Sequence, residues 1–298
     1  MGGRIVSKIE WTNKTWNPVT GCSKYSEGCQ NCYAEKMTKR LAAMGQEKYK
    51  NGFNKVVFHP EELNRDFGGK SKMIFVNSMS DTFHADISKF QISKMLEYCS
   101  FNKQHIFQIL TKRAARIEEF SYPPNVWLGV TVEKENYKNR IEFLRHTDAK
   151  IKFLSCEPLL GDLGELDLTG IDWVIVGGES GPGARPMHPD WVRNIKTQCR
   201  KQDVPFFFKQ WGEWIPTSQA PNLSIFLKTK RMGILLKDGS LLDGIFPSDV
   251  KKWEERTKDS IEGRRGVIVF KVGKVNSGAV LDYTVYKEFP KILQKEEK

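Results

Sequence analysis

Three cysteines near the start of the sequence have the type and spacing needed to hold a metal centre. Cys22, Cys29 and Cys32 form a C-x6-C-x2-C motif with glycine at both bends of the loop. A C-x2-C pair can place two thiolates on one centre, and the glycines allow the third thiol to reach it. Because no fourth cysteine lies beside them, three thiolates would leave one coordination position open.

The open coordination position would be used differently by a zinc site and by an iron–sulfur cluster. A structural zinc ion would need a histidine as its fourth ligand, and His59 and His84 are the candidates. A four-iron cluster would instead keep one iron free to bind a substrate or cofactor. We favour the iron–sulfur cluster, because a lone histidine in an α/β protein is usually a hydrogen-bonded structural residue.

The segments that must position this loop alternate between short apolar runs and amphipathic stretches. The expected strands are 73–76, 105–110, 126–130, 151–154, 173–176 and 205–208, with a first strand within 5–17; the expected helices are 32–44, 87–100, 112–120, 136–146 and 189–202. Strands that alternate with helices form a parallel sheet with helices outside it. The sequence therefore predicts an α/β fold that is a partial or complete (β/α) TIM-like barrel.

This alternation stops at about residue 214, which gives the expected domain boundary. We expect residues 1–213 to form the barrel, and residues 214–298 to form a C-terminal mixed extension of hairpins and short helices packed on it. Each predicted strand is followed by small, polar or charged residues. In a (β/α) barrel the carboxyl ends of the strands meet on one face, where such barrels carry their chemistry. The cysteine loop would join that face after the first strand.

Composition narrows the class of protein and of partner. The net charge of +11 favours an anionic partner, with nucleic acid foremost, although a basic surface that serves only solubility is the alternative. Six cysteines, half of them grouped, fit a reducing cytosol better than a secreted disulfide scaffold. No apolar run approaches the ~18 residues that span a bilayer, and the first residues lack the apolar segment of a signal peptide. We therefore expect a cytoplasmic protein with no membrane partner.

Several segments resemble those of a known group of enzymes. They are WNPVTGC at 16–22, CQNCYA at 29–34, SMSD at 78–81, SCEPLLG at 155–161 and GGESG at 177–181. The chain resembles the radical S-adenosylmethionine (SAM) enzymes, and more closely a phage-associated, radical-SAM-like family of largely uncharacterised function. Some members of that family are associated with a three-Cys-motif partner protein. The resemblance covers about residues 11–289.

The resemblance implies two cofactors and a set of residues that contact them. Cys22, Cys29 and Cys32 would hold a [4Fe-4S] cluster whose free iron binds SAM, and a reductant such as flavodoxin or ferredoxin would supply the electron that cleaves SAM to a 5′-deoxyadenosyl radical. The candidate cofactor-binding residues are Tyr33, Ser78, Ser80, Asp81, Gln108, Glu133, Ser155, Glu157, Gly177, Gly178 and Glu179, and the candidates for binding an anionic substrate are Lys112, Arg185 and Lys209.

Two features depart from the common radical-SAM pattern. The first gap of the motif is six residues instead of three, and Tyr33 follows the third cysteine where an aromatic residue usually precedes it. In addition, the common Gly-Gly-Glu follows the second strand, whereas here it is residues 177–179 and follows a later one. We therefore assign the contact to the SAM amino group to Ser78, Ser80 or Asp81. Asp81 has a second interpretation, as the N-cap of the following helix.

Two alternatives to an enzyme acting on nucleic acid or nucleotide remain. One is a non-catalytic, zinc-stabilised nucleic-acid-binding protein, in which the three cysteines hold zinc. The other is a radical SAM enzyme that modifies a peptide or a partner protein. Iron and acid-labile sulfide content distinguishes the zinc-stabilised binding protein from a radical SAM enzyme. Salt-dependent binding of DNA or RNA distinguishes a nucleic-acid substrate from a peptide or protein substrate.

Overall fold

The computed structural model describes residues 9–220, 229, 231–245 and 266–291. These residues belong to two compact units, each described separately below. The first unit comprises residues up to Thr131 together with Asn139–Ser155, and the second comprises Val132–Lys138 and the chain from Cys156 onward. The domain boundary expected at residue 213 stays a prediction.

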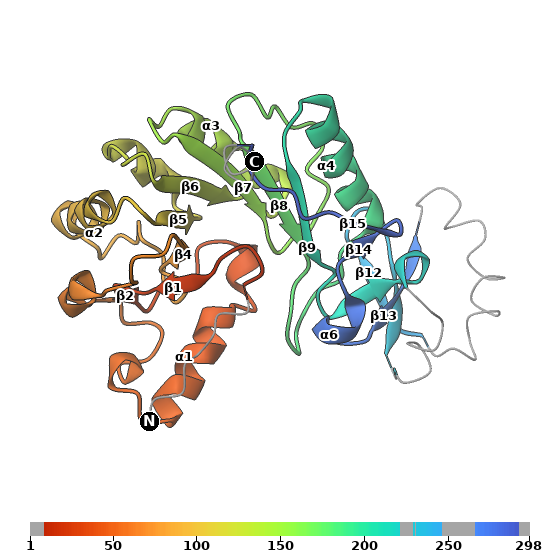
Figure 1. Cartoon of the computed structure of the whole chain (residues 1–298). Coiled ribbons are helices and arrows are strands. Elements are labelled where there is room, and N and C mark those ends of the chain that lie inside the picture. Colours follow the sequence, from red (N-terminus) through yellow and green to blue (C-terminus); the bar gives the residue numbers. More distant parts are fainter. Residues whose placement is uncertain (1–8, 221–228, 230, 246–265, 292–298) are drawn as a thin grey trace. The chain divides into compact units, whose positions relative to one another are not determined.

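The first unit is built on five parallel strands, in the order β1-β4-β5-β6-β7. Their bounds are β1 Lys14–Trp16, β4 Met73–Val76, β5 Ile106–Thr111, β6 Val126–Thr131 and β7 Ile151–Cys156. The helices between them are α1 Tyr33–Ala43, α2 Lys89–Phe101 and α3 Asn139–Arg145 (Figure 1). A small antiparallel pair, β2 Val19–Thr20 with β3 Val57–Phe58, flanks the segment that contains α1.

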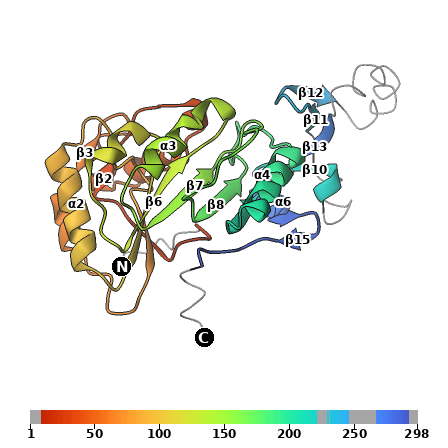
Figure 2. The same ribbon diagram turned by 90° about the horizontal axis from the view of Figure 1, so that it is seen from above.

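Both faces of these strands are buried by aromatic side chains. On the face covered by α2 (Figure 2), Tyr98 of the helix stacks on Trp16 and Phe107, with ring centroids 4.4 and 5.9 Å apart. On the other face, Trp11 contacts Phe75 and Phe153 at centroid distances of 4.8 and 6.2 Å. Strands buried on both faces are rich in apolar residues without alternation, which is why they are recognisable in the sequence.

Most of the expected elements are present, with two differences in the helices. Helix α2 begins where a capping box of Ser88 and Gln91 satisfies its first amide groups. The expected helix 112–120 is a short 3-10 helix, Ala114–Glu119, whose first position has no side-chain cap and which ends before prolines 123 and 124. The expected helix 136–146 begins as a separate 3-10 turn, Glu135–Tyr137, before α3.

The second unit contains one parallel pair of strands and an antiparallel sheet. Strands β8 Trp173–Gly177 and β9 Phe206–Gln210 are parallel and are connected through α4 Pro189–Lys201. The antiparallel sheet has the order β10-β13-β11-β12, with bounds Trp214–Pro216, Val267–Lys271, Met232–Leu235 and Leu241–Ile245. Within it, β11 and β12 pair antiparallel as neighbouring strands of the chain.

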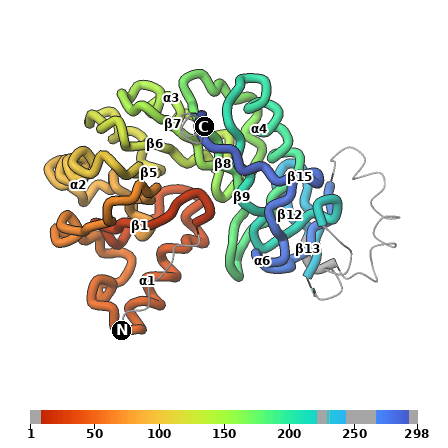
Figure 3. The backbone as a smooth tube through the Cα atoms, in the orientation of Figure 1, coloured from red at the N-terminus to blue at the C-terminus, as the bar shows by residue number. Residues whose placement is uncertain are grey.

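The last described segment lies along the edge of β9. After α6 Lys274–Ser277, the short strands β14 Val280–Leu281 and β15 Thr284–Val285 lead into it. It then runs antiparallel to β9 through a bridge between Phe207 and Lys287 (Figure 3). This pairing covers an edge that would otherwise offer unpaired backbone groups.

Parallel strands that alternate with helices define the fold class. Five such strands lie in the first unit and two in the second, and the chain is an α/β protein of the partial (β/α)-barrel type, as the sequence predicts. Within the described ranges, no helix is both long and apolar enough to cross a membrane.

A buried histidine gives the first unit a predictable dependence on pH. His105 is 1% exposed and packs edge-on against Phe67 and Phe107. Burial, and secondarily Lys72, lowers the pKa of His105 below its ordinary value. The unfolded chain therefore takes up this proton at a higher pH than the folded chain. We expect the free energy of unfolding to fall as the pH is lowered from about 7.5 through about 6.5, the ordinary histidine pKa.

Urea unfolding of the wild type and of His105→Gln at several pH values checks this expectation. The variant should lose part of the pH dependence, whatever its absolute stability. The matched control is His146→Gln, because the side chain of His146 is 66% exposed. An unchanged pH dependence in His105→Gln would show that other groups cause it.

Candidate functional site

The cysteine loop follows β1 and β2 and ends at the start of α1. Cys22, Cys29 and Cys32 are free thiols, all half-buried, and Cys32 occupies the N-cap position of α1. The amide of Cys22 donates to the carbonyl of Phe53 at 2.7 Å. Gly21 has a φ of +78°, and a Cβ there would lie 2.0 Å from the carbonyl oxygen of Lys55. The motif therefore needs glycine at this bend for a structural reason.

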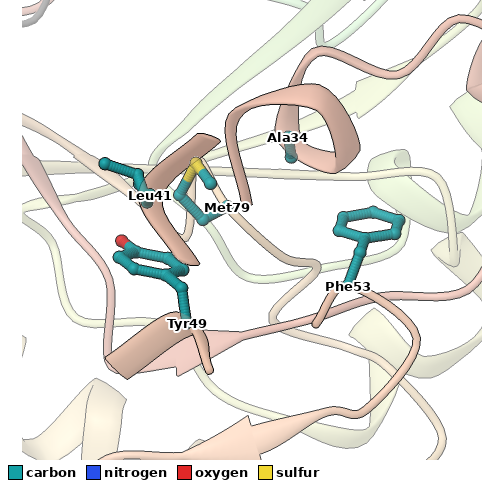
Figure 4. Close-up of a cluster of buried hydrophobic side chains, with 5 residues drawn as sticks. All are labelled: Ala34, Leu41, Tyr49, Phe53 and Met79. Atoms are coloured by element: carbon teal, nitrogen blue, oxygen red, sulfur yellow. The ribbon is translucent and has the colours of Figure 1, made fainter. Parts of the chain in front are cut away.

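The loop that follows β4 is packed against the cysteine loop. The hydroxyl of Ser80 donates to the carbonyl of Gly21, directly before Cys22. Met79 belongs to a hydrophobic cluster made with Ala34, Leu41, Tyr49 and Phe53, and Figure 4 shows its side chain beside that of Leu41. Cys22 and Cys32 pack against the same cluster. The SMSD segment therefore packs against the cysteine motif, and its assigned contact with the SAM amino group stays a prediction.

Asp81 joins this loop to the end of β5. Its Oδ1 accepts from the Thr111 hydroxyl at 2.7 Å and from the Phe83 amide at 2.9 Å, and its Oδ2 accepts from the Lys112 amide at 3.2 Å. The N-cap of α2 is Ser88, so the interpretation of Asp81 as the cap of that helix is wrong. Asp81 is only 8% exposed and holds two strand ends together.

The anchoring role of Asp81 predicts the effect of Asp81→Asn. An asparagine retains one acceptor oxygen, but its amide group faces the Lys112 amide, so one buried donor loses its acceptor. We expect a loss of about 1–3 kcal/mol in the free energy of unfolding, measured in urea. Asp86→Asn is the control, because the Asp86 side chain is exposed in the same loop. Normal stability combined with lost SAM binding would instead make Asp81 a cofactor contact.

A positively charged side chain lies against the cysteine loop from the end of β5. Arg113 donates from Nη2 to the carbonyl and hydroxyl oxygens of Ser23, at 3.1 and 2.8 Å, and its guanidinium lies 4.7 Å from the centre of the Tyr25 ring. Burial raises the pKa of the Cys22 thiol to about 12, with a contribution from Asp81, while Arg113 acts in the opposite direction. A bound metal would displace this proton.

Both histidines considered as zinc ligands already have hydrogen-bond partners on each ring nitrogen. The Nε2 of His59 is 2.7 Å from the Thr20 hydroxyl and its Nδ1 is 3.2 Å from a Glu61 oxygen. The Nδ1 of His84 accepts from the Asp86 amide, and its Nε2 is 2.8 Å from the Ser23 hydroxyl. In the described part of the chain, no three His, Cys, Asp or Glu side chains converge as a formed metal site.

The donor set of the loop fits an iron–sulfur cluster in its chemistry. All three thiols are free and half-buried, two of them pack on the same hydrophobic cluster, and all lie on one continuous loop. Thiolates are the ligands of iron–sulfur clusters. The residues that would hold the cluster are Cys22, Cys29 and Cys32.

The other predicted cofactor- and substrate-binding residues of the first unit differ in burial and in hydrogen-bond partners. Tyr33 is 63% exposed at the start of α1. The Ser78 hydroxyl donates to the Asn17 side chain at 3.1 Å, and Lys112 Nζ donates to the Thr131 hydroxyl at 3.4 Å. Gln108 is fully buried, and its Oε1 has no hydrogen-bond donor among the described residues. Ser155, at the end of β7, pairs in register with Thr131 and is buried.

The candidates in the second unit pair with one another. Lys209 Nζ is 3.1 Å from a Glu157 oxygen, and both side chains are mostly buried. Arg185 holds Glu179 through Nη2 at 2.6 Å and Nε at 2.9 Å, a bidentate pair. Glu133 is fully buried, and its carbonyl accepts from the Leu160 amide. These pairs join predicted cofactor contacts to predicted substrate contacts, and their assigned roles stay predictions.

The glycine pair at the end of β8 is closely packed. A Cβ on Gly177 would lie 2.5 Å from a carboxylate oxygen of the Glu157 side chain, and one on Gly178 would lie 1.9 Å from the Trp211 backbone carbonyl oxygen. The space beside both glycines is therefore occupied by other groups of the chain, and at Gly178 by backbone.

Two basic residues near the cysteine loop differ in how far the sequence points to them. Arg113 lies two residues after β5, where the rule that strand ends carry function marks it. Arg140 of α3 is buried, donates to the Thr131 carbonyl at 2.7 Å and lies 5.6 Å from the Tyr25 ring centre. No local pattern marks Arg140, because its partners are set by the tertiary fold.

The fold and the cysteine loop define an α/β protein of partial (β/α)-barrel type with a three-thiol motif after its first strand. The profile of a family described as a protein of unknown function, DUF5131, matches residues 6–290. The chain belongs to this family. No curated protein matches the sequence.

Solved structures of spore photoproduct lyase show a distant likeness. A cysteine-to-serine mutant of that enzyme is 13% identical, with a TM-score of 0.37, over 87% of this chain and 75% of that one. The complex of spore photoproduct lyase with dinucleoside spore photoproduct is 12% identical, with a TM-score of 0.38, over the same fractions of the two chains. A further mutant, with bound AdoMet and dinucleoside spore photoproduct, is 11% identical with a TM-score of 0.38, also over the same shares.

Proposed function

We propose that this protein is a radical SAM enzyme whose cysteine loop holds a [4Fe-4S] cluster. The observation that carries the proposal is the set of three free, half-buried thiols, Cys22, Cys29 and Cys32, in one loop at the carboxyl end of β1. When bound, the cluster and SAM supply reductive cleavage of SAM and a 5′-deoxyadenosyl radical that abstracts hydrogen.

The residues of the chain would hold and orient these groups. Ser80 and the hydrophobic cluster around Met79 fix the front of the loop, and Arg113 fixes it from the end of β5. The hydrophobic cluster that packs against Cys22 and Cys32 would shield that side of the centre from water, which limits side reactions of a reactive radical. Three protein thiolates leave the fourth position available to SAM.

The substrate class follows from charge alone. A net charge of +11 favours an anionic substrate, and we propose a nucleic acid or nucleotide. The proposed partners are a flavodoxin- or ferredoxin-like reductant and a three-Cys-motif protein. A peptide or partner protein as substrate is the alternative outcome of a substrate search.

The test is anaerobic reconstitution, followed by iron and sulfide analysis and EPR of the reduced protein with and without SAM. We expect about four irons and four sulfides per chain. We also expect a reduced-cluster signal that changes when SAM is added, and formation of 5′-deoxyadenosine. Stoichiometric zinc without sulfide, and no response to SAM, would overturn the proposal and favour a zinc-stabilised binding protein.

A further inference from the structure

Arg113 is the basic residue whose contacts centre on the cysteine loop at Cys22. Its Nη2 bonds both oxygens of Ser23, the residue after Cys22, and its guanidinium lies over the ring of Tyr25. One positive charge therefore anchors the loop at Ser23 and Tyr25, beside the first cysteine of the motif.

Several groups fix the place from which Arg113 reaches the loop. The Thr111 hydroxyl accepts from the Arg113 amide at 2.9 Å and donates to Asp81. His84 Nε2 also lies 2.8 Å from the Ser23 hydroxyl. Because Nδ1 of His84 accepts from a backbone amide, its Nε2 carries the hydrogen and donates to Ser23. The Ser23 oxygen thus accepts two bonds and is held between Arg113 and His84.

We propose that Arg113 is a positioning residue for the iron–sulfur cluster: it fixes the loop around Cys22, and its positive charge raises the reduction potential of the cluster. The inference rests on the proposed function. One-electron reduction adds negative charge to the cluster, so a cation beside a ligand stabilises the reduced form more than the oxidised form. Groups outside the ligand set commonly tune metal centres in this way.

Two substitutions separate charge from hydrogen-bond geometry. Arg113→Gln removes the charge, whereas Arg113→Lys keeps it but cannot form the same fork on Ser23 or stack on Tyr25 in the same way. The matched control is Arg145→Gln, because Arg145 pairs with Glu142 within its own helix. The measurement is the cluster midpoint potential, from an EPR-monitored redox titration of the reconstituted full chain without SAM.

We expect Arg113→Gln to lower the ratio of reduced to oxidised cluster at a fixed potential roughly tenfold. This corresponds to a midpoint potential about 59 mV more negative for a one-electron couple. Arg113→Lys should lie much closer to the wild type, and Arg145→Gln should equal it. A fully loaded Arg113→Gln protein with the wild-type potential overturns the inference. So does an Arg113→Lys shift as large as that of Arg113→Gln, because charge would then not be the cause.

A third variant keeps the inference testable if Arg113→Gln takes up too little cluster to titrate. Ser23→Ala removes the hydroxyl that anchors the guanidinium, but keeps the charge and all three cysteines. Because the charge stays, a potential close to that of the wild type supports the inference, and a shift of about 59 mV or more overturns it, since hydrogen-bond geometry would then be the cause. Failure of the wild type to take up any cluster would contradict the proposed function itself, so the two failures are distinguishable.

Discussion

Replacing any one of Cys22, Cys29 and Cys32 with alanine is expected to remove most of the iron and acid-labile sulfide that the wild type takes up in anaerobic reconstitution. Two thiolates cannot hold a four-iron cluster that already has one iron without a protein ligand. SAM cleavage, measured as 5′-deoxyadenosine, should fall to background in the same variants. Because the three side chains are only half-buried, we expect the unloaded variants to stay folded.

Cys99→Ala provides the matched control. Cys99 is a free cysteine, but it is fully buried in α2 and far in sequence from the motif. Its replacement should leave iron and sulfide at the wild-type level, with only the modest loss of stability expected when a small buried group is removed. Equal loss of iron in Cys99→Ala would mean that the motif is not the binding site. Zinc that binds the wild type and is lost from the three motif variants would make the centre a zinc site.

The strands and the position of the cysteine loop were predictable because burial leaves a direct signal in the sequence. The expected strand 73–76 coincides with β4, and the expected first strand within 5–17 contains β1. A strand covered on both faces must be apolar along its length, and turn-forming or polar residues must follow where it reaches solvent. The same reasoning placed SMSD beside the cysteine motif, where the Ser80 hydroxyl bonds the Gly21 carbonyl.

The roles of individual polar residues were less predictable, because they depend on partners distant in sequence. Asp81 lies in the loop after β4, but the hydroxyl and amide that donate to its carboxylate belong to Thr111 and Lys112, about thirty residues later. Glu157 likewise pairs with Lys209, which lies far later in the sequence, at 3.1 Å. A sequence shows that a carboxylate is present at a strand end, but the fold decides whether another side chain already holds it.

The second large effect is expected at Gly178, whose replacement by alanine should destabilise the second unit strongly. The added Cβ would lie 1.9 Å from the carbonyl oxygen of Trp211, and that backbone has little freedom to move. The Gly178 amide donates to the Gln210 carbonyl at 2.9 Å, and the Gln210 side chain donates back to the Gly178 carbonyl, also at 2.9 Å. We expect a loss of about 3 kcal/mol or more in stability, since overpacking against backbone cannot be relieved by a rotamer change.

A matched substitution separates this clash from a general effect of removing glycine. Gly69→Ala should change stability by less than about 0.5 kcal/mol, because no described atom lies within 4 Å of its added Cβ. Thermal unfolding of the two variants and the wild type gives the comparison, with a fall of roughly 5–10 °C expected for Gly178→Ala. If Gly178→Ala melts with the wild type but fails to bind SAM, the glycine leaves room for a ligand. If it is destabilised as expected, the Gly-Gly-Glu segment of this chain serves first to bring the ends of β8 and β9 together.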